Sequence, residues 1–183
     1  MWWIIVLVVV VLLVLFVVGA YNGLVRSRNQ VDNAWSQIDV QLKRRIDLIP
    51  NLVETVKGYA EHEKSTLDAV INARNAAMAA PSTPAGQGAA DSQITSALRQ
   101  LFALSEAYPD LKANQNFLAL QEELTATEGR VSYARQFYND SVLGYNNKLQ
   151  TFPTVVLAGM FNFQKRDFFQ ADPADRQVPK VQF

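Results

Sequence analysis

The pattern of hydrophobic and polar residues begins with an unbroken apolar segment. Residues 1–20 read MWWIIVLVVVVLLVLFVVGA and contain no charged or strongly polar side chain. About 20 apolar residues in a helix cross the roughly 30 Å hydrocarbon layer of a bilayer. From residue 22 onward the chain is polar enough to be water-soluble. The pattern therefore predicts a transmembrane helix over residues 1–21 that tethers one water-facing domain, residues 22–170, to a membrane.

A cleaved signal peptide is the alternative interpretation of this segment, because residues 18–20 resemble a small-residue cleavage site. Signal peptides begin with a positively charged region and carry an apolar stretch of about 7–15 residues. Here the apolar segment is longer and no basic side chain precedes it, which favours the anchor. Trp2, Trp3 and Tyr21 lie near its ends, and aromatic residues are enriched at membrane–water interfaces.

The basic residues that flank the apolar segment predict its orientation. Arg26 and Arg28 follow it closely, Lys43, Arg44 and Arg45 come further on, and no basic side chain precedes it. Because lysine and arginine accumulate on the cytoplasmic side, we expect the amino terminus outside and the bulk domain in the cytoplasm.

Lys43, Arg44 and Arg45 form the only basic run of the chain. A solvated helix face and a contact with anionic lipid headgroups are both compatible with it. The whole sequence has 17 basic and 17 acidic residues, and hence a formal net charge of zero. This balance, without a basic stripe, argues against nucleic-acid binding.

The water-facing part has helical periodicity. Apolar residues recur every three or four positions over residues 31–49, which indicates one buried stripe along a helix. Only Gly23 opposes a helix between the anchor and this stripe, so the spanning helix can continue into it. Pro50 predicts a kink or break, and the apolar pattern resumes at Leu52 and continues to residue 77.

The stretch 79–93, AAPSTPAGQGAADSQ, is rich in Pro, Gly, Ser and Ala and predicts a flexible loop. A short helix is expected from Ile94 to about Tyr108, where Asp110 is a candidate cap for the next helix. That next helix, residues 111–150, is expected to be the longest, because its apolar residues keep helical steps throughout.

Pro153 predicts a further break. Residues 154–163 are apolar but too short to span a bilayer, so we expect a short helix that covers one end of a bundle. Residues 171–183 are expected to form an extended carboxyl-terminal tail. The sequence therefore predicts an all-α fold, a long antiparallel bundle of three to four helices on a single N-terminal transmembrane helix.

The sequence offers little catalytic chemistry. His62 is the only histidine, and there is no cysteine. The metal motif HExxH would need a second histidine at the position of Thr66. We therefore interpret His62 as an exposed helix residue, and we expect no metal, no cofactor and no catalytic residue.

Two groups of polar residues have structural interpretations. Arg74 and Arg135 lie in apolar helices, and we expect each to form a structural ion pair. Their candidate partners are Glu54, Glu123 and Glu128. The asparagines are unusually many for helices, and two interpretations stay open: buried hydrogen bonds that fix helix register, or a polar contact surface for another subunit. They are Asn22, Asn29, Asn33, Asn51, Asn114, Asn116, Asn139, Asn146 and Asn147.

Several sequence blocks resemble the LemA family. The most specific are YNGLV (residues 21–25), Asn29, VDNAWSQIDVQLKRR (31–45) and DLIPNLV (47–53), followed by VKGY (56–59) and His62-Glu63. Further matches are Asn116-Phe117, Leu120-Gln121, Thr127-Glu128, Ala134-Arg135 and Tyr138-Asn139. The resemblance covers essentially the whole chain. It implies a bacterial membrane-anchored helical domain with its amino terminus outside, and no established catalytic activity.

The leading functional hypothesis is a scaffold that self-assembles as a homo-oligomer at the bacterial inner (cytoplasmic) membrane. It is motivated by the nearly aliphatic anchor, by helices longer than a small bundle needs and by the lack of catalytic groups. Candidate contacts with another copy or a partner are Trp35, Leu42, Lys43, Arg44, Arg45, Asn139, Asn146, Phe161 and Phe163. The hypothesis loses its best surface if Trp35, Leu42 and Val131 are buried within one subunit.

Two other classes of function stay open. An adaptor would bind another membrane protein, such as a protease or an envelope enzyme, through an exposed apolar patch. Phe161, Phe163, Phe168 and Phe169 are the candidates for that patch. An enzyme would need a pocket in which titratable groups converge.

Overall fold

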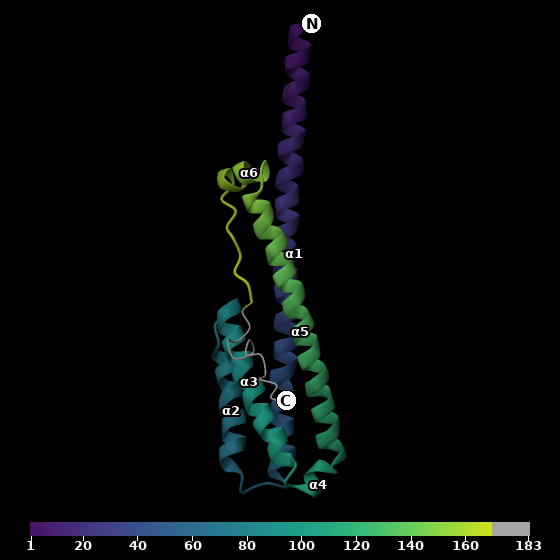
Figure 1. Cartoon of the computed structure of the whole chain (residues 1–183), viewed down its shortest axis with the longest axis vertical. Helices are drawn as coiled ribbons and strands as arrows, with labels where there is room; N and C mark the ends of the chain where they lie inside the picture. Colours follow the sequence, from purple (N-terminus) through teal and green to yellow (C-terminus); the bar gives the residue numbers. More distant parts are fainter. Residues whose placement is uncertain (170–183) are drawn as a thin grey trace, which may run out of the picture. The chain divides into compact units, whose positions relative to one another are not determined.

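The computed structural model describes residues 1–169, which fold into helices and contain no strand. The helices are α1 (Trp2–Lys57), α2 (Lys64–Ala79), α3 (Pro84–Ser105), α4 (Pro109–Lys112), α5 (Gln115–Gln150) and α6 (Thr154–Met160) (Figure 1). The expected all-α fold is confirmed. The tail expected over residues 171–183 lies outside the described residues.

The described chain divides into two compact units. Unit 1 comprises residues 1–37 and 136–168, and unit 2 comprises residues 38–135 together with Phe169. Helices α1 and α5 each contribute one part to unit 1 and another to unit 2.

Helix α1 carries the apolar segment and continues beyond it without interruption. It contains a window long and apolar enough to cross a membrane, and no side chain of that window is buried. The segment expected to span the membrane is therefore the first part of a helix of 56 residues. This makes α1, and not the helix after residue 111, the longest helix of the described chain.

Pro50 lies inside α1, which continues to Lys57, so the expected break is wrong. A proline in a helix interior removes one backbone donor and crowds the carbonyl of the preceding turn. Ile49, Leu52 and Val56 are fully buried on either side of it. Their burial, about 1.5–3 kcal/mol for each side chain, holds the helical geometry across the proline.

Helix α3 begins ten residues before Ile94, inside the stretch expected to be a flexible loop. Thr83 caps the helix, because its Oγ1 accepts a hydrogen bond from the Gly86 N–H at 3.2 Å. Pro84 occupies the first turn, where a missing N–H removes no intrahelical bond. The loop prediction is therefore wrong over residues 84–93, and the connection from α2 is short.

The small residues of this stretch have packing roles. Gly88 and Ala90 are buried in α3, where small side chains allow a close approach to neighbouring elements. A Cβ on Gly86 would lie only 2.7 Å from the Pro81 carbonyl oxygen. Glycine at that position therefore permits the tight start of the helix.

The start of α5 also differs from expectation. The Asn114 Oδ1 accepts a hydrogen bond from the Phe117 N–H at 3.0 Å and so caps the helix. Asp110, the expected cap, lies within the short helix α4. Leu111 of α4 is fully buried and belongs to the apolar core, so α4 packs against that core.

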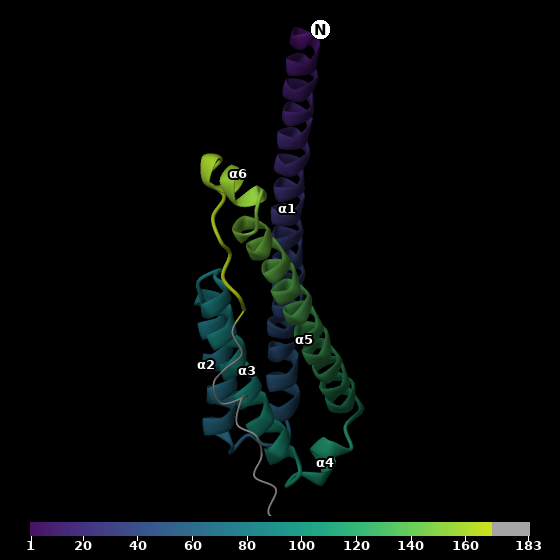
Figure 2. The same cartoon turned by 45° about the horizontal axis from the view of Figure 1, so that its top comes forward.

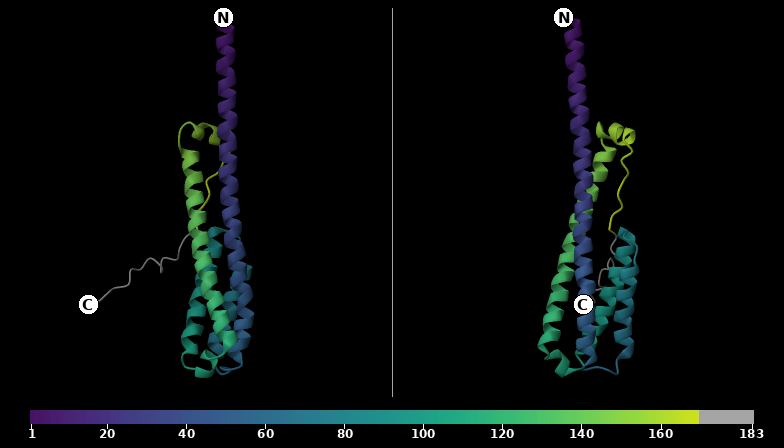
Figure 3. Two further views of the ribbon diagram at one scale, coloured as in Figure 1. Left: turned by 90° about the vertical axis from the view of Figure 1, so that its right-hand side faces the viewer. Right: turned by 180° about the vertical axis from the view of Figure 1, so that it is seen from behind.

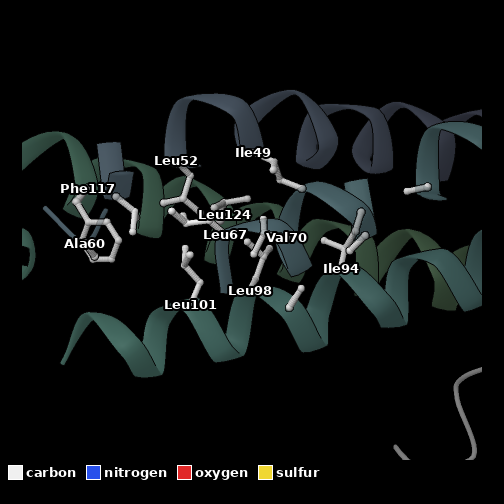
Figure 4. Close-up of a cluster of buried hydrophobic side chains, with 14 of the residues drawn as sticks. Ile49, Leu52, Ala60, Leu67, Val70, Ile94, Leu98, Leu101, Phe117 and Leu124 are labelled. Carbon is white, nitrogen blue, oxygen red and sulfur yellow. The ribbon is translucent and has the colours of Figure 1, made fainter. Parts of the chain in front are cut away.

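The core of unit 2 lies among α2, α3, the end of α1 and the start of α5. Helices α2 and α3 pack side by side (Figures 1 and 2). Figure 4 shows side chains of both helices, Leu67, Val70, Leu98 and Leu101 among them, within one apolar cluster.

Unit 1 is built on two antiparallel helix segments, the first part of α1 and the last part of α5 (Figure 3). The buried apolar residues of these two segments are Leu24, Val31 and Ala34 of α1, and Tyr138, Val142, Tyr145 and Leu149 of α5. Helix α6 and the segment 161–168 complete the unit.

Candidate functional site

Aromatic and basic residues gather in unit 1 where the apolar segment of α1 ends. The Tyr21 ring packs edge-on against Phe161 and Phe163, with ring centroids 4.8 and 5.7 Å away. The Arg28 guanidinium lies 5.5 Å from the Phe163 centroid, within the range of a cation–π contact. We call these four residues the membrane-proximal cluster. The structure thus brings together residues that the sequence singled out for two separate reasons.

The chain after α6 is held against α5 by buried polar groups. The Asn146 side chain donates to the Arg166 carbonyl at 2.8 Å and accepts from the Arg166 N–H at 3.0 Å. These two bonds satisfy the side-chain amide much as a neighbouring strand would. Asn146 is therefore buried and hydrogen-bonded, but its partner is the segment after α6 and not a second helix, so these bonds do not set a helix register.

Two tyrosines of α5 support the same segment. The Tyr145 hydroxyl donates to the Gln164 carbonyl at 3.0 Å, and the Tyr138 hydroxyl donates to the Asp167 carbonyl at 2.9 Å. Burial raises the pKa of both tyrosines, and the positive charge of Arg166 partly opposes this shift. Both hydroxyls therefore stay protonated donors well above neutral pH.

The apolar assembly candidates on α1, Trp35 and Leu42, are half-buried and buried. Leu42 is a core residue, as is Val131 of α5. Trp35 is half-buried, and its ring lies 5.4 Å from that of Tyr138 within unit 1. Leu42 and Val131 are therefore used inside the subunit, and Trp35 is used there in part.

The remaining predicted residues have varied environments. Lys43 and Arg44 are exposed, and Arg44 forms an ion pair of 2.6 Å with Glu123. Asn139 is half-buried. The four further membrane-interface candidates are exposed: Trp2, Trp3, Arg26 and Arg28.

Arg45 is the exception in its basic run, because it lies in the interior of unit 2. Its Nη1 lies 2.7 Å from the Asp91 Oδ1 and donates to the Thr95 hydroxyl at 3.0 Å. The side chains of Arg45 and Asp91 are only 3% and 2% exposed. The expectation of a solvated or lipid-facing Arg45 is therefore wrong. A charge at this depth needs a partner, and Asp91 supplies it.

Asp91 also pairs with Arg135, so that one carboxylate joins two arginines. Glu128 lies 3.7 Å from the Arg45 Nη2. Burial lowers the pKa of Arg45, and the negative charge of Glu128 opposes this. We call Arg45, Asp91, Glu128 and Arg135 the buried ion cluster.

The sequence anticipated an ion pair for Arg135 but not its partner. Its carboxylate comes from the stretch expected to be a loop, and not from the three glutamates considered. Within residues 1–169, Arg74 forms no ion pair with Glu54, Glu123 or Glu128, so that expectation is wrong.

A polar pocket of about 380 Å³ opens beside the buried ion cluster. Besides the cluster, hydroxyl-bearing residues and Arg99 line it. Titratable groups converge here, but Asp91 and Glu128 are both engaged by arginine. This lining contains no histidine or cysteine that could act with a hydroxyl as a nucleophile and base.

His62 is exposed, as expected. It lies in the turn between α1 and α2, however, so the expectation that it belongs to a helix is wrong. The turn is fixed by its neighbours, since the Ala60 N–H donates to the Val56 carbonyl at 2.9 Å. Within the described part of the chain, no group of three or more His, Cys, Asp or Glu residues is placed to hold a metal ion.

Comparison with known proteins identifies relatives of this chain by sequence. The sequence pattern of the LemA family matches residues 34–183. Protein LemA of Metamycoplasma hominis is 29% identical over 159 residues, which cover 87% of this chain and 73% of that protein. Magnetosome protein MamQ 2 of Paramagnetospirillum magneticum is 25% identical over 179 residues. Magnetosome protein MamQ of Magnetospirillum gryphiswaldense has the same identity, and each alignment covers 84% of this chain and 66% of the MamQ protein.

The family match extends over most of the chain, from within the first helix to the carboxyl end. The apolar first part of α1 supplies the means of membrane attachment. The chain belongs to the LemA family and is a membrane-associated protein.

Proposed function

We propose that this protein is a non-catalytic scaffold that self-assembles at the bacterial inner membrane, with its bulk domain in the cytoplasm. The observation that carries the proposal is the continuity of α1, which passes from the apolar segment into the packed part of the chain without a linker. A continuous helix fixes the distance between the bilayer and what the helix carries, whereas a flexible linker would let that distance vary. Such a connection suits a protein whose function is to hold other molecules at a fixed position near the membrane.

Self-assembly would use residues other than Leu42 and Val131, which are buried. The two most exposed large apolar side chains of α5 are Tyr133 and Leu143, at 72% and 50%. Tyrosine is enriched at protein interfaces because it offers a large contact area with a polar tip. We propose these two exposed positions of α5, Tyr133 in unit 2 and Leu143 in unit 1, as contacts between copies.

The chemistry of the described residues supports a role without catalysis. The carboxylates beside the polar pocket are both partners of Arg45, and Asp91 pairs with Arg135 as well. The names of the relatives, LemA and MamQ, state no reaction.

The absence of cysteine allows a direct test with single-cysteine variants. Tyr133→Cys and Leu143→Cys probe the proposed contact, and Asp68→Cys, an exposed position on α2, is the matched control. We expect cross-linked species from the α5 variants in membranes and none from the control. The full-length protein in mild detergent should have the mass of a defined assembly. A monomer without cross-links would refute the scaffold.

An adaptor is the second candidate, favoured by Phe168, which is 42% exposed. Of the other phenylalanines considered, Phe169 is buried and its ring lies 4.8 Å from the Arg135 guanidinium. Phe163 is half-buried in the membrane-proximal cluster. A monomeric protein that carries one other membrane protein in stoichiometric amount, lost on Phe168→Ser, would favour the adaptor.

A further inference from the structure

The segment that contains α6 has a large exposed apolar surface. Residues 152–163, FPTVVLAGMFNF, include no charged side chain. Phe152, Val156 and Met160 are 84%, 55% and 73% exposed, whereas Leu157 and Ala158 face the interior. Single exposed apolar residues are ordinary, but a contiguous group marks a contact surface.

The position of this segment along α1 indicates what covers it. Phe161 and Phe163 pack on Tyr21, the first residue after the apolar segment. Both sides of this contact belong to unit 1. Helix α6 therefore lies beside α1 where the membrane anchor ends, as Figures 1 and 3 show. At that level the surroundings of α1 are the headgroup region of the bilayer.

Basic residues lie next to the two parts of this region along the chain. Arg26 of α1 and Lys165, just after the segment, are exposed and form no ion pair within residues 1–169. Arg28 lies over Phe163 in the membrane-proximal cluster. An apolar face bordered by basic side chains is typical of segments that lie in the membrane interface.

We propose that residues 152–163 insert into the membrane–water interface as a second, non-spanning membrane contact, with Arg26 and Lys165 at the phosphates of anionic lipids. The occupant is lipid because this segment packs on Tyr21, where the apolar segment of α1 ends. This inference rests on α1 spanning the membrane and is independent of self-assembly. It assigns to α6 a role in fixing the depth of the protein in the bilayer.

The test uses full-length protein in vesicles of phosphatidylcholine and phosphatidylglycerol, at a high lipid-to-protein ratio. Met160→Cys carries an environment-sensitive fluorophore, and Asp68→Cys is the matched control on α2. Two quenchers are compared: aqueous iodide, and a lipid with a nitroxide near the top of its acyl chain. We expect the label at 160 to be quenched by the nitroxide lipid and protected several-fold from iodide, with the opposite result at 68.

Two outcomes would overturn the proposal. Iodide quenching at 160 equal to that at 68 would place α6 in water. Protection from iodide without quenching by the nitroxide lipid would show that protein, either another copy or a partner, covers the surface. Val156→Cys provides a second reporter on the same surface, so that a local disturbance at 160 cannot decide the result. If the protein does not self-assemble, the cysteines at 133 and 143 will not cross-link, but the quenching of the label at 160 by the nitroxide lipid will be unchanged.

Discussion

Replacing Asp91 by asparagine should destabilise the protein, because it leaves Arg45 charged in the interior without its nearest partner. Asparagine keeps the shape of the side chain and removes only the charge. Breaking a buried ion pair from one side typically costs about 3–5 kcal/mol, and the Arg45 side chain is only 3% exposed. Glu128, at 3.7 Å, compensates in part. Arg135 is 25% exposed and can reach water. We therefore expect a loss near the lower limit, about 3 kcal/mol.

Thermal unfolding followed by far-ultraviolet circular dichroism in mild detergent measures this loss. For a chain of this size, about 3 kcal/mol corresponds to a decrease of roughly 6–12 °C in Tm. The control is Glu106→Gln, which breaks the exposed ion pair with Lys112. Exposed pairs contribute about 0–1 kcal/mol, so the control should unfold close to the wild type. An Asp91→Asn variant that unfolds within 1 °C of the control would refute the reasoning about burial.

A double variant separates charge from packing. In Arg45→Met with Asp91→Leu, both buried charges are replaced by apolar side chains of similar volume. Such replacements are often neutral or stabilising, so the double variant should recover most of the Tm lost in Asp91→Asn. If it is as unstable as the single variant, the cluster contributes through its shape and not through its charge.

Three further predictions concern other parts of the chain. Thr83→Ala removes the cap of α3 and should cost about 1 kcal/mol, measured by the same unfolding assay; no loss would show that the cap is dispensable. Tyr138 and Tyr145 have raised pKa values, so their contribution to stability is complete below about pH 10 and is lost as the pH rises through the folded pKa. Unfolding at several alkaline pH values should show this decline, which the double Phe variant should lack. A membrane-impermeant maleimide should label Trp2→Cys, but not Lys43→Cys, in intact spheroplasts; the reverse pattern would invert the proposed orientation.

Local periodicity predicted the helical elements because the buried face of a helix repeats every three to four residues. Val31, Ile38, Leu42 and Ile49 of the predicted stripe are all buried. The continuation of the membrane helix into this stripe was also foreseen, since little between them opposes a helix. The sequence pattern does not predict the membrane-proximal cluster, because the contact between Tyr21 and Phe161 depends on how α5 returns along α1.

The errors occur where local composition and tertiary packing disagree. Pro50 disfavours a helix locally, but buried neighbours on both sides outweigh it. The stretch 79–93 has the composition of a loop, yet Thr83 followed by Pro84 is also a signal for a helix start. The apolar spacing from Ala90 through Ile94 is helical as well, and it would have extended α3 toward that start.

The basic run shows how the helical repeat decides which charges can reach a membrane. Arg45 lies three residues after Leu42 and four before Ile49, so it falls on the buried stripe of α1, while Lys43 and Arg44 fall on its exposed side. A charge on a buried stripe requires a counter-charge from elsewhere in the chain, and this requirement is met by Asp91. Only two of the three basic side chains are therefore exposed, and Arg44 is paired with Glu123. Positive charge for anionic lipid must then come from exposed residues next to the membrane anchor. This is the role that the inference on α6 gives to Arg26 and Lys165.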